Sequence, residues 1–289
     1  MQVVRYLAPD NEAHVGLSID GVVSQLHTAS SVSALLREPR AQVRRLLSET
    51  SGASPADVVR LLAPIDGGTD VWAAGVTYER SEQARVEESQ IPDVYSRVYE
   101  AARPELFFKA TARRVVGPDA TIGIRDDSHW DVPEPELAVV VNAYAEVVGY
   151  TIVNDVSSRQ IESENPLYLP QAKVYAGSCA LGPGIVPEWE IDDPYALTIR
   201  LQVTRHGDGW EGQASTASLH RTIDELVACL FHGDTYPDGV VLSTGTPLVP
   251  DPPFTLEAED VVEITIDKLD QLRNTVVRGK EAFTKAHWK

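Results

Sequence analysis

Residues 134–140 read Glu134-Pro135-Glu136-Leu137-Ala138-Val139-Val140, in which two carboxylates lead into an uninterrupted apolar run. Side chains two apart on a strand project from the same face, so Glu134 and Glu136 would lie side by side. Like charges placed this close repel each other unless a cation lies between them. A hard divalent cation takes oxygen ligands and would relieve the repulsion. The alternative is that both glutamates lie on the solvated face of an edge strand.

Three further segments add polar groups to this pair. The apolar strand at 149–153 runs into Asp155, which emerges at the strand end as a third candidate ligand. Lys173 precedes the nearly uncharged segment 174–183, and a lysine that enters a buried segment needs an anionic partner. The carboxylates of Glu134, Glu136 and Asp155, or the carboxylate of a substrate, would be suitable anionic partners for Lys173. The sequence Ser-Thr-Gly-Thr-Pro at 243–247 can present N–H and O–H donors to an anion, or can be a simple turn.

The pattern of apolar and turn residues divides the whole chain into two parts. Residues 1–66 predict a small N-terminal α+β domain with strands at 3–7, 15–19 and 22–23 and helices at 32–36 and 43–47. Ser54, a capping residue followed by proline and then by Asp57, predicts a third helix there.

Residues 67–289 are strand-rich and predict the catalytic domain, a curled β-sheet core whose strand order the sequence does not give. Strands are expected at 71–76, 137–141, 147–153, 197–203, 240–243 and 261–266, and helices at 80–88, 94–102 and, after the capping box that starts at Thr222, up to about residue 231.

Composition excludes some classes of function. The 289 residues carry a net charge of −18, which repels phosphate backbones and argues against nucleic-acid binding. The apolar runs are far shorter than the roughly 20 residues that span a bilayer, so no membrane partner is expected. The first residues lack the apolar core of a signal peptide, and a cytoplasmic location follows as the default expectation.

The polar groups occur in the order and spacing of the fumarylacetoacetate hydrolase family, which the chain resembles from about residue 71 to residue 276. Each matching piece is short, but together and in order they are specific. They are Gly75-Val76-Thr77-Tyr78, Glu134-Pro135-Glu136-Leu137, Gly149-Tyr150-Thr151, Asn154-Asp155-Val156-Ser157-Ser158-Arg159, Lys173, Leu181-Gly182-Pro183 and Thr244-Gly245-Thr246-Pro247.

The resemblance implies a fold, a cofactor and an assembly. The fold is α+β, a mixed β-roll preceded by a small N-terminal α+β domain. The cofactor is Mg²⁺, or Mn²⁺ or Ca²⁺ in its place, held by Glu134, Glu136 and Asp155 with Lys173 beside it. The assembly is a homodimer or a dimer of dimers, and the family acts on 2-oxo acids and related β-dicarbonyl compounds.

One departure from the family pattern bears on the reaction. Hydrolases of the family carry a histidine three positions after the tyrosine that corresponds to Tyr78, and this histidine activates water for C–C cleavage. Here that position is Ser81, and no histidine occurs between His27 and His129. The base of a hydrolase is therefore missing from its expected place.

The stretches 75–81, 104–109 and 164–173 instead resemble a narrower branch, the dehydratases of 2-keto-3-deoxy pentonates. In that comparison Glu105 matches an active-site acid. Dehydration needs removal of a C3 proton and protonation of the leaving C4 hydroxyl, and Lys173 and Glu105 are the candidates, in either order. The candidate substrate contacts are Tyr78, Arg80, Ser81 and Thr246.

The resemblance implies a magnesium-dependent hydro-lyase that converts a 2-oxo sugar acid, a 2-keto-3-deoxy pentonate, to 2,5-dioxopentanoate in sugar-acid catabolism. A family hydrolase or decarboxylase, acting on an acylpyruvate or an oxaloacetate-like acid, is the alternative. A third class is a metal-stabilised binding protein without catalysis. The configuration and chain length of the sugar acid are not encoded in any pattern that can be placed.

Overall fold

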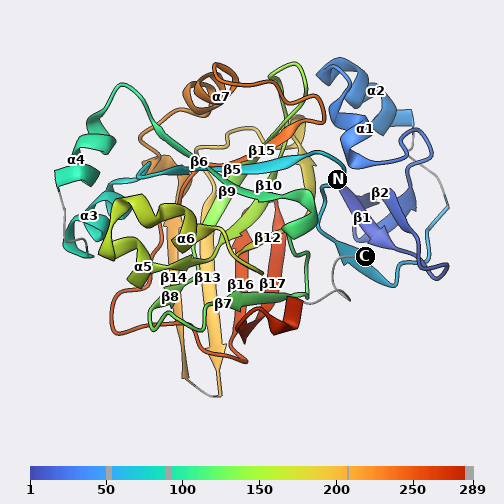
Figure 1. The fold of residues 1–289 in the computed structure, drawn as a ribbon. Coiled ribbons are helices and arrows are strands. Elements are labelled where there is room, and N and C mark those ends of the chain that lie inside the picture. The colour runs from blue at the N-terminus through green and yellow to red at the C-terminus, as the bar shows by residue number, and fades with distance from the viewer. Residues whose placement is uncertain (50–53, 89–92, 207, 284–289) are drawn as a thin grey trace.

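The computed structural model describes residues 1–49, 54–88, 93–206 and 208–283 as a mixed α+β fold dominated by β-sheet (Figure 1). The strands are β1 (Gln2–Leu7), β2 (Ala13–Ile19), β3 (Val22–Gln25), β4 (Arg60–Leu62), β5 (Asp70–Gly75), β6 (Glu105–Thr111), β7 (Thr121–Ile124), β8 (Asp131–Val132), β9 (Pro135–Val141), β10 (Val147–Asp155), β11 (Ser157–Ser158), β12 (Cys179–Pro187), β13 (Thr198–Arg205), β14 (Asp208–Ser215), β15 (Val240–Ser243), β16 (Val261–Ile266) and β17 (Asp270–Arg278).

The helices are short and lie outside the sheets. They are α1 (Val32–Leu36), α2 (Arg40–Glu49), α3 (Glu79–Glu88), α4 (Asp93–Glu100), α5 (Arg159–Glu164), α6 (Leu169–Lys173) and α7 (Ile223–Phe231). Helices α1 and α2 lie beside β1 and β2, whereas α3 and α4 lie at the opposite side of the molecule (Figure 1). None of the helices in the described part of the chain has the length and apolarity needed to span a bilayer.

Two large sheets face each other and enclose the main core. Ten strands form one sheet, in the order β3-β2-β1-β12-β10-β9-β15-β5-β6 with β4 beside β1, and five form the other, in the order β14-β13-β16-β17-β7. Residues such as Leu137 and Val139 of β9 pack against residues such as Ile199 and Ile264 of the smaller sheet. Strand β9 is therefore an interior strand whose apolar run is covered on this face.

The opposite face of the ten-stranded sheet packs against the N-terminal helices. Ala138, Val140 and Val153 share a cluster of buried residues with Leu35 of α1 and Val43 of α2. Because side chains alternate along a strand, Glu136 and Asp155 continue this second face. The metal-site candidates thus lie on the same side of the sheet as the N-terminal helices, nearer the ends of β9 and β10.

The predicted elements are largely confirmed, with one clear error. The third helix expected from Ser54 is absent: Pro55 forms a β-bridge with Ser24, and the Ala56 N–H donates to the Val23 carbonyl oxygen at 2.7 Å. Residues 50–53 lie outside the described residues. Backbone hydrogen bonds to the neighbouring hairpin satisfy the same donors that a helix would, so the tertiary contact overrides the local capping signal.

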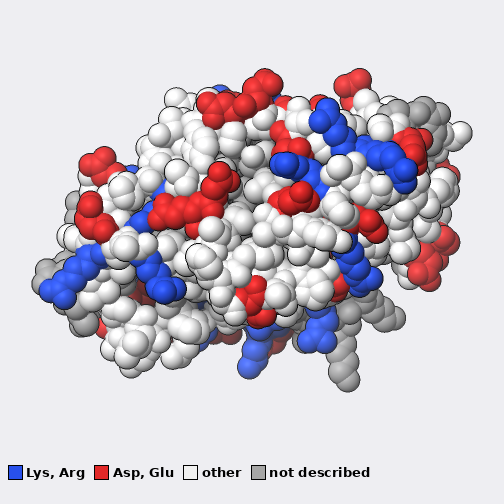
Figure 2. All heavy atoms as spheres, turned by 90° about the horizontal axis from the view of Figure 1, so that it is seen from above, with Lys and Arg blue, Asp and Glu red and all other residues white. Residues whose placement is uncertain are grey.

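On the face seen in Figure 2, charged side chains are distributed rather than concentrated. Viewed from above, acidic and basic side chains are interspersed over the exposed face (Figure 2). Arg37, for example, donates to Asp238 at 2.8 Å, and Arg200 donates to Asp267 at 2.8 Å. Exposed pairs of this kind contribute little to stability, so the fold is held mainly by its two apolar cores.

Candidate active site

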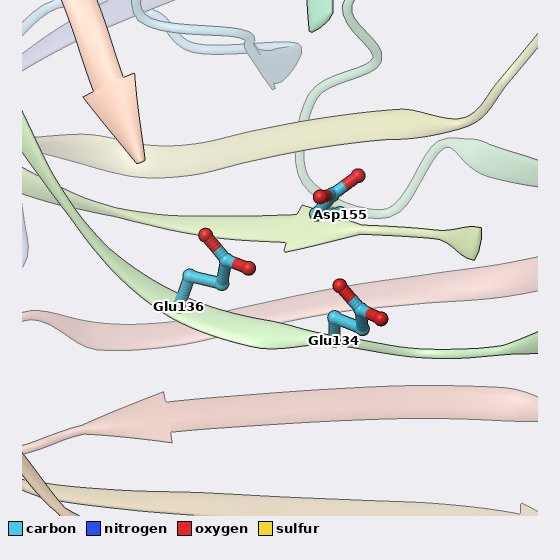
Figure 3. Close-up of side chains that lie close together, drawn as sticks. All are labelled: Glu134, Glu136 and Asp155. Atoms are coloured by element: carbon cyan, nitrogen blue, oxygen red, sulfur yellow. The ribbon is translucent and has the colours of Figure 1, made fainter. Parts of the chain in front are cut away.

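Three carboxylates converge at the ends of two paired strands. Glu134, Glu136 and Asp155 point toward a common space (Figure 3), and one oxygen of each lies within 4.8 Å of the others. All three are buried, with exposed fractions of 3%, 2% and 1%. A solvated edge strand is therefore excluded, and the set is suited to a hard divalent cation because all its donors are oxygens.

The pairing of β9 with β10 brings the three residues together. Glu136 is opposite Val153 in the register, and the Asp155 N–H donates to the Glu134 carbonyl oxygen at 3.0 Å. The Glu134 N–H in turn lies 3.2 Å from the side-chain oxygen of Asn154. The backbone positions of the three carboxylates are thus fixed by the sheet.

Two cationic side chains contact the carboxylates from the α5–α6 segment. The Lys173 ammonium donates to Glu134 Oε2 at 2.6 Å, to Asp155 Oδ2 at 3.0 Å and to Ser157 Oγ at 2.6 Å. Arg159 donates to Glu134 Oε1 at 2.8 Å. The expectation that Lys173 has an anionic partner is confirmed, and that partner is the acidic triad itself.

Glu136 is held by neutral donors from the turn after β15. Ser243 Oγ donates to Glu136 Oε2 at 2.5 Å, and the Gly245 N–H donates to the same oxygen at 2.9 Å. Of the two alternatives for residues 243–247, anion donor or simple turn, the structure shows donation to an anion, and that anion is a protein carboxylate. Burial, and then repulsion by Asp155 and Glu134, raise the pKa of Glu136 to about 8.

A small pocket, with a cavity volume of about 30 Å³, opens onto the triad. Its wall includes Lys173, Glu105, Ser81 and Thr246 of the predicted site. Gly75 also lines it, and a side chain there would collide with the Glu105 carboxylate. None of the described residues that line the pocket is a histidine. The wall comprises Ala74, Gly75, Val76, Ser81, Tyr95, Glu105, Phe107, Glu134, Glu136, Asp155, Arg159, Glu162, Leu169, Lys173, Gly245 and Thr246.

Two predicted contacts, Tyr78 and Arg80, are not part of that wall. Tyr78 is fully buried, and its pKa is raised, first by burial and then by the nearby charge of Glu136. Arg80 is partly exposed and pairs with Asp251. The Thr246 hydroxyl lies in the wall but donates to the Pro135 carbonyl oxygen at 2.9 Å.

Sequence reasoning missed one buried cation, Lys109. It is 1% exposed, forms an ion pair with Asp155 and donates to the Lys173 carbonyl oxygen at 2.5 Å. Its signal was the alternation along β6, which places Lys109 on the same face as Glu105 and Phe107. The ion pair of Arg159 with Glu134 was also not predicted, although Arg159 belongs to the family-like segment 154–159.

Comparison with known proteins agrees with this geometry. The profile described as fumarylacetoacetate (FAA) hydrolase C-terminal matches residues 70–277. The chain belongs to the fumarylacetoacetate hydrolase family.

Its relatives include dehydratases of sugar acids. The chain is 46% identical over 261 residues to a probable 2-keto-3-deoxyxylonate dehydratase of Haloferax volcanii, with 88% of this chain and 89% of the relative covered. It is 44% identical over 228 residues to 2-dehydro-3-deoxy-D-arabinonate dehydratase of Saccharolobus solfataricus, with 77% and 76% covered.

A solved structure is similar over nearly the whole chain. It is 2-keto-3-deoxy-D-arabinonate dehydratase complexed with magnesium and 2,5-dioxopentanoate, with a TM-score of 0.82, 36% identity and coverage of 96% of this chain and 99% of that one.

Proposed function

We propose that this chain is a magnesium-dependent hydro-lyase that converts a 2-keto-3-deoxy pentonate to 2,5-dioxopentanoate. The observation that carries the proposal is a buried acidic triad with Lys173 at its centre, open to a pocket whose wall holds Glu105. The relatives at 44% and 46% identity are dehydratases of this substrate class. The similar structure contains magnesium and the proposed product.

Glu134, Glu136 and Asp155 would hold the metal. Their geometry fits one, because three buried carboxylates whose oxygens lie within 4.8 Å of one another repel unless a cation separates them. When bound, Mg²⁺ supplies Lewis acidity, which polarises the keto group and stabilises the charge that develops there. Mn²⁺ or Ca²⁺ would satisfy the same oxygen donors.

Lys173 and Glu105 would carry out the proton transfers. Removal of a C3 proton expels the C4 hydroxyl, which leaves as water after protonation. The ion pairs of Lys173 with Glu134 and Asp155 favour its ammonium form, which supports Lys173 as the proton donor and Glu105 as the base. The C3=C4 double bond then moves to C4=C5, with loss of a C5 proton and protonation of C3. The resulting enol gains a proton at C4 and loses its hydroxyl proton to give the C5 aldehyde.

The remaining predicted contacts divide into two groups. Ser81 and Thr246 line the pocket and would contact the substrate directly. Tyr78 would act by holding the start of α3 in place, since its carbonyl oxygen accepts from Ser81 Oγ at 2.8 Å and from the Glu82 N–H at 3.0 Å. Arg80 would act through its ion pair with Asp251.

We also propose the finer architecture that the family suggests. Residues 1–66 would form a small N-terminal domain and residues 67–289 a catalytic β-roll, assembled as a homodimer or a dimer of dimers. Hydrogen bonding of β1 to β12, with Val3 opposite Ile185, would then join the two domains through one sheet. Sedimentation at several concentrations tests the assembly, and a concentration-independent monomer would contradict it. A cytoplasmic location stays a prediction.

The decisive experiment is an assay of both enantiomers of 2-keto-3-deoxypentonate with Mg²⁺, with identification of the product. In D2O the product should contain deuterium, because C3 and C4 each gain a solvent proton during the double-bond shift. Release of CO2 or of two carboxylic acids would instead indicate a decarboxylase or a hydrolase.

Two substitutions test the assigned residues. Lys173→Ala and Glu105→Gln should each lower kcat by about 100-fold or more while KM changes much less, as for interactions made in the transition state. Metal content should stay near wild type. Lys268→Ala and Glu164→Gln, which change exposed residues of the same types, are the matched controls.

A further inference from the structure

Lys109 is the buried charge that the proposed chemistry leaves unused. Its ammonium pairs with Asp155 Oδ1 and donates to two backbone oxygens, those of Lys173 at 2.5 Å and Val156 at 3.1 Å. Its side chain is 0% exposed. Burial of an ammonium is costly unless the charge is paired and hydrogen-bonded, so its partners here must compensate that cost.

The backbone of β6 is shaped to place this lysine. Phe108 is opposite Trp72 and Ala110 is opposite Val71, so Lys109 is the extra residue of a β-bulge. A bulge leaves its extra residue without a partner residue on the neighbouring strand. Lys109 therefore stays on the face of Glu105 and Phe107, which carries the acidic triad, and the pairing resumes with Ala110 opposite Val71.

Protein cations pair with two carboxylates of the triad, Glu134 and Asp155. These cations are buried: Lys173 contacts Glu134 and Asp155, Arg159 contacts Glu134, and Lys109 contacts Asp155. Each carboxylate oxygen that pairs with a cation is less available to a metal ion. Lys109 therefore opposes the metal at Asp155, by occupying an oxygen and by repelling the cation.

The second contact of Lys109 concerns Lys173. The Lys173 carbonyl oxygen, at the end of α6, accepts from Lys109 and from Ser178 Oγ at 2.8 Å. These donors fix the backbone from which the Lys173 side chain reaches the triad. One ammonium thus contacts both a metal ligand and the backbone of the proposed proton donor.

We propose that Lys109 is a positioning residue that lowers the metal affinity of the site and holds Lys173 in place for proton transfer. The effect on metal affinity rests on the acidic triad alone, and the effect on turnover rests also on the proposed function. Loss of Lys109 should therefore have opposite consequences, tighter metal binding and slower turnover. A residue that served only packing would weaken both.

Two substitutions separate the two contacts. Lys109→Met removes the charge and the donors, whereas Lys109→Gln removes the charge but keeps an N–H₂ group that can donate to the backbone oxygens. Both variants should bind Mn²⁺ at least tenfold more tightly than the wild type. Lys109→Met should lower kcat at least tenfold, and Lys109→Gln should lower it less.

Titration of the metal-free protein with Mn²⁺, followed by the electron paramagnetic resonance of the free ion, measures affinity without any substrate. Lys268→Met, which removes an exposed lysine charge, is the control and should stay within about twofold of wild type. Unchanged or weaker Mn²⁺ binding in both Lys109 variants would overturn the proposal. If the proposed reaction is wrong, the Lys109 variants should still bind Mn²⁺ more tightly than the wild type, and only the predicted change in kcat would fail.

Stability gives a second readout if a variant folds poorly. A variant that folds only when Mn²⁺ is present supports the proposal, because the metal then supplies the charge that Lys109 provided. A variant that stays unfolded with and without Mn²⁺ contradicts it, because the role of Lys109 would then be structural.

Discussion

Replacing Glu136 with glutamine should abolish metal binding without weakening the metal-free protein, whereas Glu134→Gln should weaken both. The two residues are two apart on the same face, yet their partners differ. Glu134 contacts the cations Arg159 and Lys173, while Ser243 and the Gly245 N–H are the donors that hold Glu136. Comparing Glu134→Gln with Glu136→Gln therefore separates a carboxylate that pairs with protein cations from one whose charge only a bound metal would compensate.

The magnitude for Glu134 follows from its two ion pairs. Both are buried, with Glu134, Arg159 and Lys173 at most 3% exposed. Removing one partner of a buried ion pair costs about 3–5 kcal/mol, because the remaining charges are left without compensation. Metal-free Glu134→Gln should be less stable than the wild type by about that amount.

The magnitude for Glu136 follows from its pKa, which is raised from 4.5 to about 8. A raised carboxyl pKa means that the fold favours the protonated form, so this contribution to stability is fully present at low pH and is lost as the pH rises through this interval. At pH 7 the loss is at most about 3 kcal/mol. Glutamine is neutral at every pH, so metal-free Glu136→Gln should be as stable as the wild type or more stable.

Urea unfolding followed by tryptophan fluorescence, with EDTA and with Mg²⁺, measures these differences. A metal at about 100 times its Kd stabilises the wild type by roughly 2.7 kcal/mol, and Glu136→Gln should lose most of this gain. A Glu136→Gln protein that is destabilised in EDTA as much as Glu134→Gln would refute the reasoning. Retention of the full magnesium effect would show that Glu136 is not a metal ligand.

Four further outcomes are expected. Burial raises the pKa of Asp131 to about 6, so the stability that its protonated form contributes is lost as the pH rises from about 4 to 6. In urea unfolding, Asp131→Asn should therefore be more stable than the wild type by about 1–3 kcal/mol at pH 8 and no more stable near pH 4. Asp126→Asn, which changes an exposed aspartate, is the control and should show no gain at either pH. Gly75→Ala should displace the Glu105 carboxylate and lower kcat at least tenfold while metal content, measured by atomic absorption, is unchanged. Thr222→Ala should cost about 1 kcal/mol in urea unfolding, since its side chain caps α7 at the Glu225 N–H. No single histidine substitution should reduce turnover more than about tenfold; a 100-fold loss without unfolding would show that a histidine acts as acid or base. The histidines to test are His14, His27, His129, His206, His220, His232 and His287, the last of which lies outside the described residues.

The sequence by itself determined the parts of this protein that are set by local pattern. Alternation and apolar runs located β9, β10 and β13, and Thr222 with Glu225 located the start of α7. The spacing of Glu134 and Glu136 placed both on one face, because the period of a strand is two. Asp155 was expected at a strand end and lies there.

Tertiary structure decided which groups meet. Ser243 reaches Glu136 across 107 positions of the chain, and Lys109 reaches the carbonyl oxygen of Lys173 across 64. No local pattern encodes such distances, since they depend on which strands pair and in what register. The hairpin contact that replaces the helix expected at Ser54 has a similar origin: hydrogen bonds with distant backbone overrode the local preference.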